Sequence, residues 1–132
     1  MTLIHYPTPE RIIEYNLLAL AVLKAKKADR PAVLSKPKLF GIVDACKDKE
    51  GDIYDKAVVL LQGIVKQHPF ASGNRRTAVI VVKDFLLENG EKLAVKDDPT
   101  QARVLLGIRE DFYTTEETKD WLKHGRIREF KR

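Results

Sequence analysis

The sequence predicts an all-α fold, a compact bundle of about six helices in which a polar loop joins the two central ones. Apolar residues recur at intervals of three and four over most of the chain. Residues that start and stop helices separate these stretches. The length of 132 residues fits one domain, so residues 1–132 are expected to form a single unit.

The first part of the chain is expected to contain two helices and their connectors. Pro9 and Glu10 are typical of a first helical turn, because proline fits the first position and an acid favours the positive end of the helix dipole. The pattern indicates helices over about 9–28 and 37–47, a connector over 29–36 and a polar turn over 47–52.

The third helix, expected over 53–67, has the clearest apolar stripe, which consists of Ile53, Ala57, Leu60, Leu61 and Ile64. The next position of that stripe is His68, so this histidine is expected at the inner edge of the helix and not on its solvent face. Pro69 disfavours helical backbone at the preceding residue, so the helix should end at His68.

The segment after Arg76 is expected to be a central, buried helix. Its β-branched residues at 78–82 would suit a strand, but the apolar pattern continues to Leu87, which is too long for a typical strand. Asn89 and Gly90 supply a helix stop. Beyond them the pattern indicates an extended piece at 92–96, a helix over about 99–108 opened by Asp98-Pro99, and a helix from the capping box at 114–117 to about Lys123, ended by Gly125.

Composition argues against secreted and membrane classes. The single cysteine, Cys46, excludes an internal disulfide, which favours a reducing, cytoplasmic setting. The N-terminus lacks a basic start followed by an apolar run, so no signal peptide is expected. The longest apolar stretch, 17–23, is far shorter than the roughly 20 residues that span a bilayer, so no membrane segment is expected.

Positive charge is concentrated at the C-terminus. The chain has a net charge of +5, and residues 123–132 contain five basic side chains and one acidic one. We expect a basic tail that is free to move. Such a tail could contact nucleic acid, but only Phe130 among its residues could stack on a base, so nucleic-acid binding is not expected.

The loop at 68–76 combines residues that suit phosphate chemistry. His68 can act as a base, and Phe70 has no polar group and can anchor the loop in the core. Gly73 permits close approach of the backbone to a ligand, and Asn74 can turn the chain.

Two arginines follow at the expected start of a helix. Arg75 and Arg76 lie where the helix dipole favours anions, so they are unfavourably placed unless an anion binds there. Backbone N–H groups and two guanidinium groups would then converge on one phosphate. The alternative is that these residues are a solvated pair beside a structural histidine.

The run HPFASGNRRTA, residues 68–78, resembles the signature of the Fic/Doc (Fido) family, His-x-Phe-x-Asp/Glu-Gly/Ala-Asn-x-Arg. It is most similar to the Doc (death on curing) toxin branch, whose motif continues Asn-Lys-Arg-Thr-Ala. The resemblance covers about residues 50–124. It implies a small helical bundle that transfers a phosphate from ATP or another nucleoside triphosphate to a hydroxyl of a target protein.

The resemblance also implies roles for individual residues. His68 would take the proton from a Ser, Thr or Tyr hydroxyl of the target, which in the Doc branch is a translation factor. Gly73, Asn74 and the loop backbone, with Ser72 and Arg75 beside them, would hold the phosphates. Arg76 would neutralise charge on the transferred group. The sequence does not place the segment that docks the target, and residues 29–36 and 47–53 are the two candidates.

Two departures from the family pattern leave alternatives open. Ser72 stands where the family has the carboxylate that holds Mg²⁺, so metal binding by this side chain is not expected, and a catalytically impaired binding module is one alternative. Mg²⁺ could still bind through water and the phosphates of the nucleotide. Ser72 could instead cap the next helix. Val79 stands where the AMP-transferring branch has a second arginine, which favours phosphate transfer and leaves AMP transfer as the second alternative.

The family's inhibitory helix, Ser/Thr-x-x-x-Glu-Gly/Asn, has no match in the chain. Cys46 stands four residues before Glu50, and Asp84 stands four before Glu88. The resemblance therefore implies that inhibition comes from a separate antitoxin chain.

Overall fold

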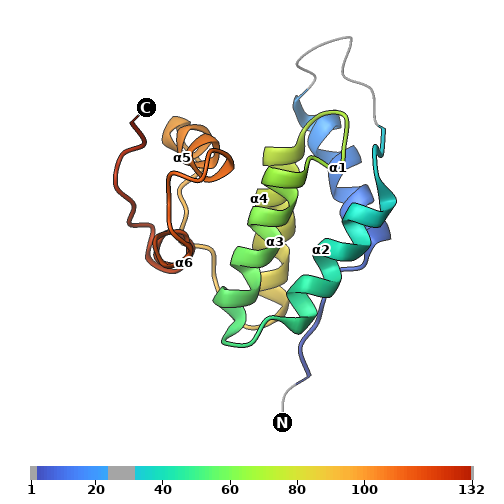
Figure 1. Ribbon diagram of the computed structural model, residues 1–132, viewed down its shortest axis with the longest axis horizontal. Coiled ribbons are helices and arrows are strands. Elements are labelled where there is room, and N and C mark those ends of the chain that lie inside the picture. Colours follow the sequence, from blue (N-terminus) through green and yellow to red (C-terminus); the bar gives the residue numbers. More distant parts are fainter. Residues whose placement is uncertain (1–2, 24–31, 132) are drawn as a thin grey trace.

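The computed structural model describes residues 3–23 and 32–131, and this part of the chain contains six α-helices (Figure 1). They are α1 (Pro9–Leu23), α2 (Lys36–Asp48), α3 (Ile53–Gln67), α4 (Asn74–Glu88), α5 (Pro99–Arg109) and α6 (Thr115–His124). Figure 1 shows α3 and α4 in the middle, with α1 and α2 on one side and α5 and α6 on the other. The expected all-α bundle is therefore confirmed.

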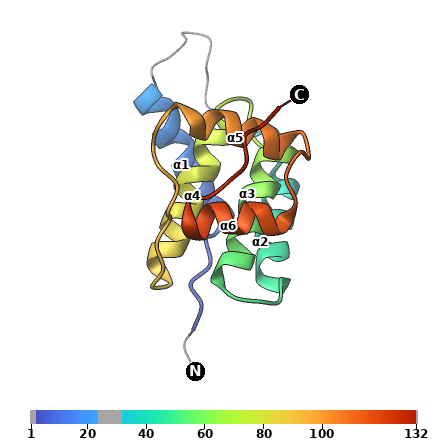
Figure 2. The same cartoon turned by 90° about the vertical axis from the view of Figure 1, so that its left-hand side faces the viewer.

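The core lies between the two central helices and the helices that flank them. The stripe of α3 is buried from Ala57 onward, with Leu60 and Ile64 at 0 % exposure, and Ile53 at its start is partly buried. On α4 the inward face includes Val82 and Phe85, also buried. Figure 2 shows α5 and α6 lying across the outer side of these helices. None of the described helices is long and apolar enough to cross a membrane.

The helix ends agree with the local signals in the sequence. Asp98 caps α5, the capping box of Thr114 and Glu117 opens α6, and Gly125 ends α6 at a φ of 73°. The helix boundaries differ from the predicted ones by a residue or two, except that the expected end of the first helix at Ala28 lies outside the described residues. Residues 92–96, where an extended piece is expected, form neither helix nor strand, and the Ala94 N–H donates to Leu122 O at 2.9 Å.

The basic tail packs against the domain over its described part, 125–131. Phe130 is 3 % exposed, and the Tyr113 hydroxyl donates to Arg128 O at 2.9 Å. The Arg128 guanidinium lies 4.0 Å from the centre of the Phe112 ring and pairs with Glu117. Two of the tail's cations thus face carboxylates, since Arg126 pairs with Asp120 as well.

This packing should depend on pH through Glu117. Hydrogen bonds from Arg128, and then from the Thr114 N–H, hold the pKa of Glu117 at about 2, below its ordinary 4.5. Because the folded-state pKa is depressed, the stabilisation is complete above pH 4.5 and is lost as the pH falls through about 2. We expect the difference in unfolding free energy between the wild type and Glu117→Gln to be constant near neutral pH and to vanish over that window. Glu116→Gln, on the same first turn, is the matched control for the loss of one carboxylate.

Candidate active site

The loop that follows α3 begins with a left-handed residue. His68, with a φ of 48° and a ψ of 61°, forms the C-cap of α3. The residue is exposed. The expectation that His68 would lie at the inner edge of the helix is therefore wrong. Helical backbone ends at Gln67, so the left-handed His68 does not continue the apolar face of α3. The imidazole is accordingly accessible to a partner from outside.

Phe70 anchors the loop, and Asn74 clamps it. Phe70 is 1 % exposed. Its backbone N–H donates to Asn74 Oδ1 at 3.0 Å, and its carbonyl accepts from Asn74 Nδ2 at 2.9 Å. Because the Asn74 amide is engaged at both ends, its backbone N–H is the group that remains for a phosphate.

The segment before α2 pairs with the loop. Pro69 O accepts from the N–H groups of Leu34, at 2.8 Å, and Ser35, at 3.3 Å. The Ala71 N–H donates to Ala32 O at 2.9 Å, so Val33 and Phe70 form an antiparallel bridge. One of the two segments expected for docking thus contacts the loop over its described residues, whereas the other, 47–53, lies at the opposite end of α3 (Figure 1).

Helix α1 holds the other side of the loop through a residue that the sequence analysis missed. Asn16 is 2 % exposed, and its Nδ2 donates to Ser72 O at 2.9 Å and to Thr77 Oγ1 at 3.1 Å. Leu20 lies next to Gly73, where an added Cβ would be 3.1 Å from Leu20 Cδ2. The only signal in the sequence was one polar residue inside the apolar run of this helix.

The start of α4 presents unpaired donors. Gly73, with a φ of 76°, is the N-cap of α4, so the alternative in which Ser72 caps this helix is wrong. The N–H groups of residues 73–76 have no hydrogen-bond acceptor among the residues that the structure describes. Arg75 and Arg76 are exposed and form no ion pair within residues 3–23 and 32–131. Helix dipole, free N–H groups and two guanidinium groups therefore all favour an anion at this point.

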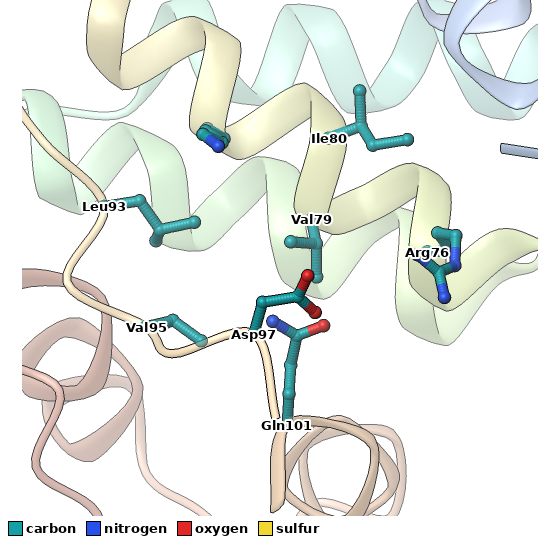
Figure 3. A pocket seen from close by; sticks show the side chains of 8 residues that line it. Arg76, Val79, Ile80, Leu93, Val95, Asp97 and Gln101 are labelled. Carbon is teal, nitrogen blue, oxygen red and sulfur yellow. The ribbon is translucent and has the colours of Figure 1, made fainter. Parts of the chain in front are cut away.

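A cavity adjoins this anion site and shares Arg76 with it. It has a volume of about 210 Å³ and is lined by Arg76, Val79, Ile80, Lys83, Leu93, Val95, Asp97 and Gln101. Figure 3 shows that α4 forms one wall and the irregular segment before α5 the other, with Asp97 and Gln101 reaching toward Val79. Half of the lining residues are thus apolar, and the other half are charged or polar.

The donor groups at the loop do not fit a magnesium site made of side chains. Mg²⁺ prefers carboxylate oxygens, and the side chain of Ser72 carries a hydroxyl instead. In the described part of the chain no three His, Cys, Asp or Glu side chains gather where they could hold a metal ion.

Comparisons with known proteins agree with the motif. The sequence model of a family described as the Fic/DOC family matches residues 7–86. A protein named toxin Doc, from Mycolicibacterium smegmatis (strain ATCC 700084 / mc(2)155), is 39 % identical over 96 residues. The match covers 73 % of this chain and 62 % of the relative, so the chain matches less than two thirds of that protein's length.

Proposed function

The chain belongs to the Fic/DOC family, and from this membership and the geometry of the loop we propose that it transfers a phosphorus-containing group from a nucleoside triphosphate to a hydroxyl of a target protein. The observation that carries the proposal is the row of N–H groups at residues 73–76 that have no acceptor within the described part of the chain. Arg75 and Arg76, which form no ion pair there, belong to this row, and the exposed His68 stands five residues before Gly73. These groups match the three tasks of phosphoryl transfer, which are to hold the donor, to neutralise charge and to accept a proton.

In the proposed reaction each group has one task. His68 takes the proton of the target's hydroxyl while the hydroxyl oxygen forms its bond to phosphorus. The bond from phosphorus to the leaving phosphate breaks, and the leaving group carries away the electron pair. The N–H groups of residues 73–76 hold the donor's phosphates, and Arg76, with Arg75 beside it, offsets the negative charge that develops on the transferred group.

We propose transfer of the terminal phosphate, a Doc-like protein kinase activity, as the first candidate reaction. The position three residues after Arg76 is occupied by Val79, an apolar residue that lines the cavity, so it lacks the second arginine of the AMP-transferring branch. AMP transfer by the same loop is the second candidate. A catalytically impaired binding module is the third, and it is motivated by Ser72.

One labelling experiment separates these candidates. The purified chain is incubated with cell extract and with ATP labelled at either the α- or the γ-phosphate, with and without Mg²⁺. Label from γ alone on a protein indicates a kinase, and label from α indicates AMP transfer. If neither label is transferred and the His68→Asn variant behaves identically, the chain is a binding module and the transferase proposal is wrong.

We also propose that a separate antitoxin chain restrains this activity, and that the target is a translation factor in the cytoplasm. Support comes from the name of the relative, toxin Doc, and from the absence of the family's inhibitory motif in the sequence. Expression of the chain alone should then arrest growth, and expression of His68→Asn should not. Harmless expression of a folded wild-type chain that is also inactive in vitro would contradict this proposal.

The cavity beside Arg76 is the proposed place for the nucleoside part of the donor. The apolar part of its lining suits a base, and it shares Arg76 with the residues that would hold the phosphates. Val79→Phe fills the cavity, so we expect it to weaken ATP binding about 10- to 100-fold, the equivalent of one buried apolar group. Binding of inorganic tripolyphosphate should stay unchanged.

Isothermal titration calorimetry with both ligands measures this difference. Leu87→Phe, an exposed position near the far end of the same helix, is the matched control and should bind both ligands like the wild type. Equal losses of ATP and tripolyphosphate binding in Val79→Phe would show that the substitution disturbs the loop and does not block a nucleoside site.

A further inference from the structure

Asn16 of α1 contacts the loop through a side chain that has no task in the proposed reaction. The amide is buried in the interior, and both of its N–H donors are used, one for Ser72 O at 2.9 Å and one for Thr77 Oγ1 at 3.1 Å. The first bond crosses 56 positions of sequence and reaches the peptide that immediately precedes the cap of α4. Asn16 is therefore placed to set the orientation of that peptide.

The orientation matters because a peptide is planar. The described residues contain no cis peptide bond, so the carbonyl of Ser72 and the N–H of Gly73 point in opposite directions. Asn16 binds the carbonyl on the α1 side, and the N–H of Gly73 consequently points away from α1. This N–H is the first of the four free donors at residues 73–76.

The opposite orientation is within reach of this backbone. Gly73 has no Cβ, so it tolerates the large change of φ that accompanies rotation of the peptide. After rotation a carbonyl oxygen would face the anion site and repel phosphate. The Gly73 N–H would then face Asn16 Nδ2, which is also a donor, so this state costs the bond to Ser72 O and requires the Asn16 amide to rotate.

We propose that Asn16 is a positioning residue that keeps the Ser72–Gly73 peptide with its N–H directed at the anion site. The expected effect of Asn16 on nucleotide affinity rests on the function proposed above. Its expected effect on the orientation of the Ser72–Gly73 peptide does not. Asn16→Asp is the decisive change, because it keeps the shape of the side chain and replaces the donor with an acceptor. The carboxylate repels the Ser72 carbonyl and attracts the Gly73 N–H, so the preferred orientation should reverse.

The test measures the peptide and the ligand separately. In the free protein, NMR couplings between the Gly73 amide and α protons report its φ, which is 76° here. We expect these couplings to change in Asn16→Asp and to keep their wild-type values in Thr77→Val, which removes only the second bond of Asn16. Affinities for ATP and for inorganic tripolyphosphate should fall at least tenfold in Asn16→Asp and less than twofold in Thr77→Val.

Asn89 offers a matched control for loss of stability. Its Nδ2 donates to Phe85 O at 2.8 Å and to His5 O at 2.9 Å, at the opposite end of α4. Asn89→Asp loses comparable bonds, and we expect it to bind both ligands like the wild type. If Asn16→Asp fails to fold, Asn16→Ala replaces it. The alanine favours neither orientation, so we expect the Gly73 couplings to be averaged between the two.

Each outcome has a defined meaning. Wild-type couplings in the Asn16 variants, or an equal loss of affinity in Asn89→Asp, would overturn the assignment of Asn16. If the wild-type chain binds neither ATP nor tripolyphosphate, the proposed function fails, and the couplings still decide whether Asn16 orients the peptide.

Discussion

Replacing His68 by asparagine is expected to reduce transfer of label to the target roughly 10²- to 10⁴-fold, the usual contribution of a positioned base. Asparagine is the sharpest substitution here, because it tolerates the left-handed backbone that His68 adopts at a φ of 48°. The loop should keep its conformation, and binding of ATP should stay within about twofold of the wild-type value. The loss would then fall on the chemical step, as single-turnover kinetics can show.

The control for this substitution is His5→Asn. His5 is exposed near the N-terminus, and its backbone N–H and carbonyl form its hydrogen bonds with Asn89. This variant should transfer label at the wild-type rate. A full rate in His68→Asn would remove the histidine from the mechanism and leave the loop as a site for binding alone.

Replacing Phe70 by alanine is expected to lower the free energy of unfolding by about 3–5 kcal/mol, the range for deleting a buried aromatic side chain. Phe70 is 1 % exposed, and its backbone is held by the Asn74 amide and lies in the bridge with Val33. Such a loss is a large share of the roughly 5–15 kcal/mol that stabilises a typical domain. Urea denaturation measures it, and ATP affinity should fall as well, because the loop loses its anchor.

Phe40→Ala is the companion measurement. Phe40 is 51 % exposed on α2, so its removal should change stability by no more than about 0.5 kcal/mol. Similar losses for the two variants would mean that the loop is not anchored by burial of Phe70.

Much of the fold could be predicted because its signals are local. Asp98-Pro99, the capping box at Thr114 and the stop at Gly125 each act within a few residues of a helix end, and the structure uses all three. The identities of the loop residues were also available, since they stand together in the sequence from His68 to Arg76.

What could not be predicted is how distant parts of the chain hold the loop. The bond from Asn16 to Ser72 and the pairing of 32–35 with 69–71 join segments far apart in sequence, and periodicity carries no information about them. The same limit explains the error at His68. Extending the stripe of α3 assumed helical backbone at one more residue, whereas the residue turns left-handed.

The two distant ties of the loop also bear on the order of folding. Helices α3 and α4 are neighbours in sequence, so they can pair early, at a small cost in loop-closure entropy. The ties to Asn16 and to residues 32–35 close much longer stretches of chain. We therefore expect substitutions in the α3–α4 interface to slow folding, and Asn16 substitutions mainly to speed unfolding. The chain would thus acquire its scaffold first and a competent anion site only in the last step of folding.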